Sequence, residues 1–180
     1  LVPEKGADVL VRAFPDVISA VPEARLVIAG DGPERNRIRA ALPAGWEGNQ
    51  VRLLGRVSRA SLDGQFEGAW VQAVPSVWVE PFGISAAEAL MRGTPVVASD
   101  RGGLPEIVID GESGFLVPAG DPRALAQALI TVLENRDLAQ EMGRTARREA
   151  LARFTISRHV DRLLSIYGEV RVGSARERTA

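Results

Sequence analysis

The sequence predicts an α/β domain with a Rossmann-like parallel sheet and helices on both faces. Short apolar runs rich in β-branched residues alternate along the chain with amphipathic stretches that repeat every three to four residues. Strands separated by helices need crossover connections, which make a sheet parallel and cover both of its faces. These two observations determine the fold class.

The strands are expected where apolar runs end in glycine or proline turns, at residues 24–30, 51–55, 70–74, 95–99 and 114–118. The helices are expected at residues 7–20, 33–42, 58–68, 84–92, 121–135, 137–152 and 155–170. Ser58 and Asp121 are suited to cap two of these helices, and Pro122 suits a first helical turn. Pro15 is expected to kink or interrupt the first helix.

Composition indicates one globular domain over residues 1–180, in which 154–170 form a C-terminal helix and 171–180 a disordered tail. The net charge is −1, which argues against nucleic acid as a partner. The chain has no cysteine, so disulfides, thiolate metal sites and cysteine nucleophiles are excluded, and a cytoplasmic location is expected. Because it begins with Leu1 rather than Met, the chain looks like a piece of a longer protein.

The turns rich in glycine or proline follow the strands. They comprise Gly30–Pro33, Gly55–Arg56, Pro75–Ser76 and Ser99–Gly103. In open parallel sheets, ligands bind at the carboxyl ends of the strands, so these turns are expected to share one ligand-binding rim.

The segment with most chemical content begins at Glu80. A Pro-Phe-Gly turn follows and opens a helix, and Glu88 lies eight positions after Glu80, inside that helix. Free N–H groups of Phe82, Gly83 and Ile84 at the helix N-terminus suit an anion or a hydroxyl, and carboxylates suit vicinal diols. Glutamates in helices usually face solvent, but apolar residues flank Glu88, where an unpaired carboxylate would be costly.

The stretch PSVWVEPFGISAAEALMRGTPVVASDRGGLPEIVIDGESGFLVPAGD, residues 75–121, resembles the signature region of glycosyltransferase family 4. The upstream segments EKGADVLVRAF, RLVIAGDGPE and VRLLGRV extend the resemblance over almost the whole chain. These enzymes are retaining, use nucleotide sugars and have the GT-B fold, and the chain is similar to their C-terminal, donor-binding half. The resemblance implies transfer of a glycosyl group from a nucleoside diphosphate sugar to an acceptor hydroxyl.

The resemblance also implies roles for individual residues. Glu80 would contact hydroxyls of the donor sugar, Glu88 would bond the ribose, and Lys5 would neutralise the diphosphate. The remaining positions would act through the backbone: Phe82, Gly83 and Ile84 on the sugar and distal phosphate, Gly55, Arg56 and Val57 on the nucleobase, and Gly30 and Gly32 by close approach to the donor. The alternative to these binding roles is a purely structural one: Lys5 would be an ordinary surface lysine, and Gly30 and Gly32 would serve only the turn.

The chain departs from the family pattern at its beginning. A glycine-arginine pair normally ends a central strand just before the position of Leu1, and both are absent here. The arginine shares the diphosphate charge with the lysine, so weaker phosphate binding is expected. Loss of the strand would leave unpaired strand edges in the sheet.

The resemblance implies no metal cofactor, and the sequence has no clustered metal-ligand motif, with Asp31 and Asp100 as weak candidates. The acceptor, a glycan, lipid or small molecule, would be bound by an N-terminal domain outside this chain, and the full protein could associate peripherally with a membrane. Alone, the chain is expected to be inactive. Two alternatives stay open: a non-catalytic nucleotide-sugar-binding module, and another GT-B enzyme such as a sugar phosphorylase or an epimerase.

Overall fold

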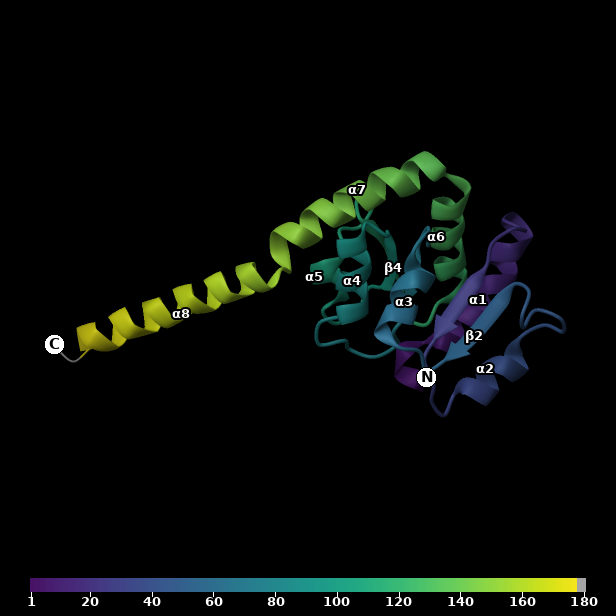
Figure 1. Ribbon diagram of the computed structural model, residues 1–180, viewed down its shortest axis with the longest axis horizontal. Coiled ribbons are helices and arrows are strands. Elements are labelled where there is room, and N and C mark those ends of the chain that lie inside the picture. Colours follow the sequence, from purple (N-terminus) through teal and green to yellow (C-terminus); the bar gives the residue numbers. More distant parts are fainter. Residues whose placement is uncertain (178–180) are drawn as a thin grey trace.

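The computed structural model describes residues 1–177, with side-chain surroundings for residues 1–169 (Figure 1). Its elements, in chain order, are η1 Pro3–Lys5, α1 Ala7–Ala20, β1 Leu26–Ala29, α2 Arg35–Ala41, β2 Val51–Gly55, α3 Arg59–Phe66, β3 Gln72–Val74, α4 Ile84–Arg92, β4 Val96–Ser99, α5 Leu104–Ile107, β5 Gly114–Val117, α6 Pro122–Glu134, α7 Arg136–Arg153 and α8 Ile156–Glu177. The expected strands and long helices are all present, within a few residues of their predicted bounds except at the end of α8, which continues past residue 170 to Glu177. The short helices η1 and α5 were not predicted.

The strands are parallel but form two sheets. In one, β1 pairs with β2, with Leu26 opposite Val51. In the other, β4 lies between β3 and β5, with Val96 opposite both Gln72 and Gly114. Among the described residues, no strand of the first sheet pairs with a strand of the second.

The N-terminal segment connects the two sheets at the carboxyl ends of their strands. The carbonyl of Leu1 accepts a hydrogen bond from the N–H of Glu34, after β1, over 3.2 Å. The carbonyl of Glu4 accepts one from the N–H of Val77, after β3, over 2.9 Å. The segment therefore runs across the break, along the rim where the sequence predicts the ligand site.

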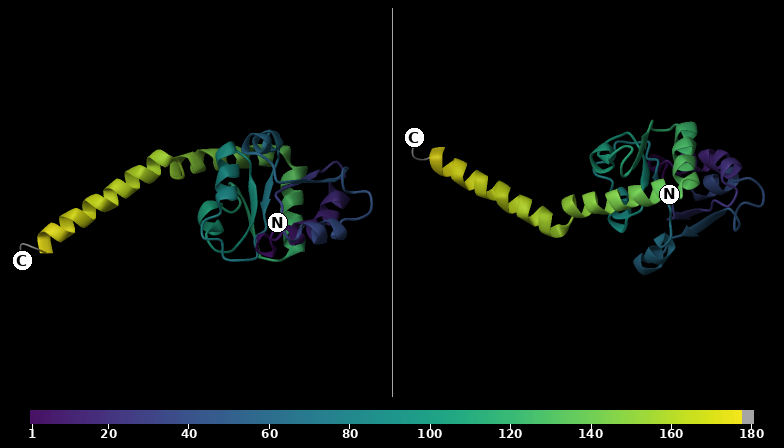
Figure 2. Two further views of the ribbon diagram at one scale, coloured as in Figure 1. Left: turned by 60° about the horizontal axis from the view of Figure 1, so that its bottom comes forward. Right: turned by 90° about the horizontal axis from the view of Figure 1, so that it is seen from above.

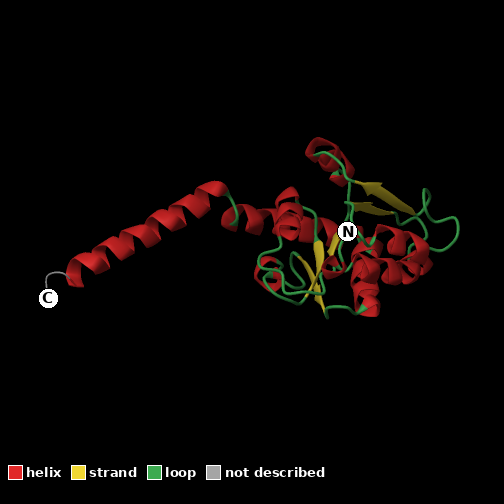
Figure 3. Ribbon diagram, turned by 90° about the horizontal axis from the view of Figure 1, so that it is seen from below, coloured by secondary structure: helices red, strands yellow, loops and turns green. Residues whose placement is uncertain are grey.

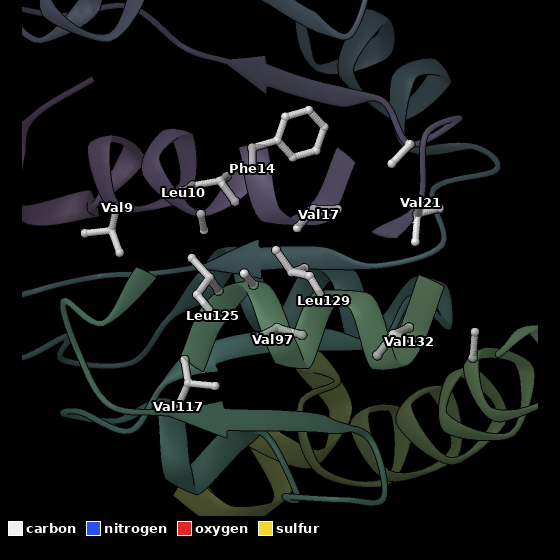
Figure 4. Packing of buried hydrophobic residues seen from close by; sticks show 14 of the residues in the cluster. Val9, Leu10, Phe14, Val17, Val21, Val97, Val117, Leu125, Leu129 and Val132 are labelled. Atoms are coloured by element: carbon white, nitrogen blue, oxygen red, sulfur yellow. The ribbon is translucent and has the colours of Figure 1, made fainter. Parts of the chain in front are cut away.

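One apolar core spans both sheets (Figure 4). Helix α1 packs mainly against α6, and their buried side chains meet those of β2, β4 and β5. Pro15 lies inside α1 without ending it, so of the two outcomes expected, a kink or an interruption, the interruption is wrong. Its side chain is exposed, and the apolar stripe continues past it through Phe14 and Val17 into the core, which offsets the lost backbone hydrogen bond.

A second core fixes the helix that carries Glu88. Helix α4 packs against α7, and its buried face consists of Ala86, Ala87, Ala89 and Leu90. All four residues of β4 are buried, with Val96 and Ala98 packed in this second core and Val97 in the first, as expected for an inner strand of a parallel sheet. The N-terminus of α4 is thereby held at the carboxyl end of β3 and β4.

Helix α8 extends away from the rest of the domain in every view (Figures 1 to 3). Apolar side chains of this helix, such as those of Ile156 and Leu164, are exposed. It continues to Glu177, so most of the tail predicted as disordered is helical, and residues 178–180 lie outside the described part. Among the described helices, none is long and apolar enough to cross a bilayer.

Candidate functional site

Lys5 and Glu80 meet at the rim. Lys5 ends η1, and the next residue, Gly6, has φ 64° and lies against the backbone carbonyl of Pro75, so closely that no side chain would fit there. This contact brings the N-terminal segment beside the residues that follow β3. The ammonium Nζ of Lys5 donates to Oε1 of Glu80 at 2.5 Å, with the lysine side chain 51% exposed and the glutamate 8%.

The carboxylate of Glu80 is buried and bound on several sides. Ser76, which has no exposed surface, donates its hydroxyl to Oε1 of Glu80 at 2.8 Å. Burial raises the pKa of Glu80, but the hydrogen bonds from Lys5, Ser76 and Trp78 outweigh it and leave this pKa below its ordinary value. The ring of Trp78 also lies 5.3 Å from the Lys5 ammonium. Glu80 is therefore a charged acceptor at neutral pH.

The loop after β4 supports the backbone of Glu80. Gly102 has φ 63°, and a Cβ at this position would collide with the backbone N and O of Glu80. The N–H of Gly103 donates to the carbonyl of Glu80 at 2.7 Å. The two glycines therefore hold the backbone of Glu80 in place by close packing and one hydrogen bond.

Helix α4 presents free amides next to Glu80. Its N-cap, Gly83, has φ 100°, and the helix begins at Ile84. Within residues 1–177, no hydrogen bond is donated by the N–H groups of Phe82, Gly83 or Ile84. The side chains of Phe82 and Ile84 are exposed, and the carbonyl of Glu80 is already engaged by Gly103. Unpaired N–H groups at a helix start carry partial positive charge, so this turn can bind an anion or a hydroxyl.

Glu88 lies on the same helix but has a partner that was not predicted. Its Oε1 accepts from a terminal guanidinium nitrogen of Arg59 at 2.7 Å, and its side chain is 29% exposed. The hydrogen bond with Glu88 raises the pKa of Arg59. Beside this pair is a cavity of about 310 Å³, lined by Phe82, Ile84, Ala87, Glu88, Met91, Arg153, Phe154 and His159.

The glycines of the first sheet form a second group on the rim. The N–H of Gly30, after β1, donates to the carbonyl of Gly55 at the end of β2 over 2.8 Å. Gly32 packs against Leu1, the start of the segment that leads to Lys5. Arg56 is exposed, Val57 is partly buried, and in the part of the chain with described side chains the Arg56 guanidinium has no hydrogen bond or ion pair. Helix α3, which follows Val57, carries Arg59 to Glu88.

Of the two weak metal candidates, Asp31 has other partners, and Asp100 is exposed. Asp31 accepts a hydrogen bond from the N–H of Gly32 at 2.9 Å and pairs with Arg35 at 3.5 Å. The bond from Gly32 contributes most to lowering the pKa of Asp31. Over the described residues, no group of three or more His, Asp or Glu side chains gathers as a metal site.

Sequence reasoning missed Ser76 and Arg59. Ser76 stood out only as a turn residue after a strand, although it lies four positions before Glu80. Arg59 follows the helix cap Ser58 and resembles any surface arginine, because its contact with Glu88 spans 29 positions of the chain. Long-range contacts of this kind leave no periodic signal in a sequence.

Comparison with known protein families identifies the family of this chain. A family described as "Glycosyl transferases group 1" matches residues 1–149. The chain belongs to this family. The family assignment and the fold class predicted from the sequence are thereby confirmed, while the roles of individual site residues stay predictions.

Named members of the family are similar over nearly the full chain. The phosphatidyl-myo-inositol mannosyltransferase of Mycobacterium leprae is 36% identical over 99% of this chain and 46% of its own length. The D-inositol 3-phosphate glycosyltransferase of a Nocardioides species is 42% identical over 74% of this chain and 32% of its own length. The chain thus spans somewhat less than half the length of the curated relatives it matches.

Solved structures of GT-B glycosyltransferases have the same fold. Anabaena HepE in complex with UDP and glucose superimposes with a TM-score of 0.78 at 29% identity, over 92% of this chain and 46% of that one. Sucrose-phosphate synthase from Thermosynechococcus elongatus gives a TM-score of 0.81 at 31% identity, over 96% and 44%. The group 1 domain described here therefore corresponds to one part of a GT-B chain.

Proposed function

We propose that this domain binds the nucleoside diphosphate sugar of a retaining glycosyltransferase of the hexosyltransferase type, in the cytoplasm. The observation that carries the proposal is the Lys5–Glu80 pair beside the free amides that open α4, with Glu88 further along the same helix. A cation and unpaired N–H groups suit a diphosphate, and two carboxylates suit sugar and ribose hydroxyls. The complexes of HepE with UDP, glucose and UDP-glucose support this class of ligand.

Each residue then has a distinct task. The ammonium of Lys5 and the amides of residues 82–84 would stabilise charge on the departing diphosphate, which is the main catalytic contribution of this domain. Glu80 would accept from hydroxyls of the transferred sugar, and Glu88 from the ribose. The backbones of Gly55, Arg56 and Val57 would face the nucleobase, at the start of the segment that leads to α3.

The acceptor would come from a further domain. In the reaction, the bond from the anomeric carbon to the diphosphate oxygen breaks and a bond to the acceptor oxygen forms, with retained configuration. This chain offers donor-side groups, so we expect it to be inactive alone. A second domain would bind the acceptor, whether a glycan, a lipid or a small molecule, and exclude water from the cleft. Because the names of the relatives refer to inositol compounds, an inositol-containing acceptor is the first to test in an activity assay.

Calorimetric titration tests the proposal. The chain is titrated with uridine, guanosine and adenosine diphosphates and with their sugar esters, and one nucleotide should bind. Glu88→Ala should weaken that nucleotide by about 1–3 kcal/mol, because it removes a charged acceptor of ribose hydroxyls. Glu112→Ala is the matched control, since Glu112 is exposed and precedes the amino end of β5, away from the rim.

The alternatives give different results. Unchanged nucleotide affinity in Glu88→Ala would contradict the ribose role. A non-catalytic module would bind the donor without turnover even in the full-length protein. A phosphorylase would respond to inorganic phosphate and need no nucleotide, and an epimerase would turn over its nucleotide sugar without an acceptor.

A further inference from the structure

Two donors of unequal mobility converge on one oxygen of Glu80. Oε1 accepts from the ammonium of Lys5 at 2.5 Å and from the hydroxyl of Ser76 at 2.8 Å. The lysine side chain is about half exposed and ends a flexible four-carbon stem. Ser76 has no exposed surface, and a single torsion, χ1, sets the position of its hydroxyl oxygen.

The backbone at Ser76 is itself fixed. Its neighbour Pro75 packs against Gly6 at a distance that admits no side chain, and Val77 donates its N–H to the carbonyl of Glu4 at 2.9 Å. The Ser76 hydroxyl is therefore held in place from both sides along the chain. Its bond to Glu80 does not depend on the position of the lysine ammonium.

A bound diphosphate would change the balance between these two donors. Phosphate oxygens carry more charge than a carboxylate and would attract the Lys5 ammonium, which has three N–H groups to share. Glu80 would then keep only part of its interaction with Lys5. Ser76 is neutral and enclosed, so a phosphate would not draw it away.

We propose that Ser76 is a positioning residue for the sugar half of the donor: its hydroxyl keeps the Glu80 carboxylate oriented toward the sugar while Lys5 engages the diphosphate. The inference rests on the proposed function and adds to it separate roles for the two donors to Glu80. Lys5 acts on the diphosphate common to all ligands, whereas Ser76 acts, through Glu80, only on ligands that carry a sugar.

The test compares two ligands on the same variant. Ser76→Ala is titrated with the nucleoside diphosphate that binds the wild-type chain and with its glucose or mannose ester. The diphosphate alone should bind within about twofold of wild type, and the ester should bind about tenfold more weakly, the loss of one hydrogen bond to a charged group. Ser76→Thr retains the hydroxyl and should restore most of the affinity for the ester.

Ser113→Ala is the matched control. Ser113 is equally buried and bonds the backbone of Ile109, before β5 and away from the rim. Its loss should lower the unfolding temperature without changing the ratio of the two affinities. A pH series adds a second readout: because the Ser76 bond lowers the pKa of Glu80, Ser76→Ala should move the acid limb of ester binding to higher pH.

The outcomes separate this inference from the proposed function. If Ser76→Ala weakens both ligands equally, or lowers only thermal stability as Ser113→Ala does, Ser76 is structural and the inference is wrong. The inference is supported if Ser76→Ala changes the ratio of ester affinity to diphosphate affinity and Ser76→Thr restores the affinity for the ester. If no nucleoside diphosphate binds the wild-type chain, the proposed function fails, and the inference fails with it.

Discussion

Replacing Lys5 by alanine tests the electrostatics of the site without any ligand. The variant leaves the carboxylate of Glu80, which is 8% exposed, without its cation while the Ser76 bond remains. A hydrogen bond to a charged group contributes about 1.5–3 kcal/mol, and exposed ion pairs contribute about 0–1 kcal/mol. Because Lys5 is half exposed, we expect a loss of about 1–2 kcal/mol at pH 7, a fall of roughly 2–8 °C in unfolding temperature.

The dependence on pH identifies the cause. The folded-state pKa of Glu80 lies below its ordinary value, so its charged interactions stabilise the fold above that value and are lost as pH falls through the folded pKa. The gap between wild type and Lys5→Ala should therefore be full at neutral pH and narrow in acid, below about pH 4.5, the ordinary value for this carboxyl.

Thermal and urea unfolding followed by circular dichroism measure this gap at a series of pH values. Arg12→Ala is the control, because Arg12 pairs with Asp8 at 3.0 Å on the exposed surface of α1 and should contribute only about 0.3–0.5 kcal/mol. A Lys5→Ala defect that stays constant between pH 7 and pH 3 would refute the reasoning, since it would then arise from lost packing rather than from charge.

Two further predictions concern packing. Gly102→Ala should lower the free energy of unfolding in urea by more than about 2 kcal/mol, because positive-φ strain of about 1–2 kcal/mol is combined with a collision against the Glu80 backbone. The control is Gly111→Ala: Gly111 has φ 76° and open space around it, so this variant should show only the strain. Leu90→Ala, at 2% exposure, should destabilise by about 2–5 kcal/mol, whereas Leu164→Ala on α8, at 63% exposure, should change stability by less than about 0.5 kcal/mol. Equal effects within either pair would contradict the structure.

Local sequence signals predicted most of the fold. The apolar runs located every strand, and the cap residues Ser58 and Asp121 accept the backbone N–H bonds that were expected of them. Pro15 does not end α1, because the local preference of proline is outweighed by a buried apolar stripe that packs on α6. Helix α5 has only four residues, too few to show a helical period.

The charged residues of the candidate site could be singled out from the sequence, but their partners could not. Glu80, Glu88 and Lys5 stood in recognisable segments, and the free amides follow from a glycine before a helix. Ser76 and Lys5 donate to the same oxygen of Glu80, and Arg59 donates to Glu88. These contacts depend on how the turns after separate strands pack together. Such meetings are set by tertiary packing, which no single stretch of sequence encodes.

The N-terminal segment has a consequence for how the domain would respond to a ligand. The same few residues that carry Lys5 also hydrogen-bond to the ends of both half-sheets, through Leu1 and Glu4. A diphosphate bound by both Lys5 and the start of α4 would add a non-covalent link between the N-terminal segment and the sheet formed by β3, β4 and β5. Nucleotide would then reduce movement of this segment relative to that sheet, and slower amide exchange in the segment and at the start of α4 would report it.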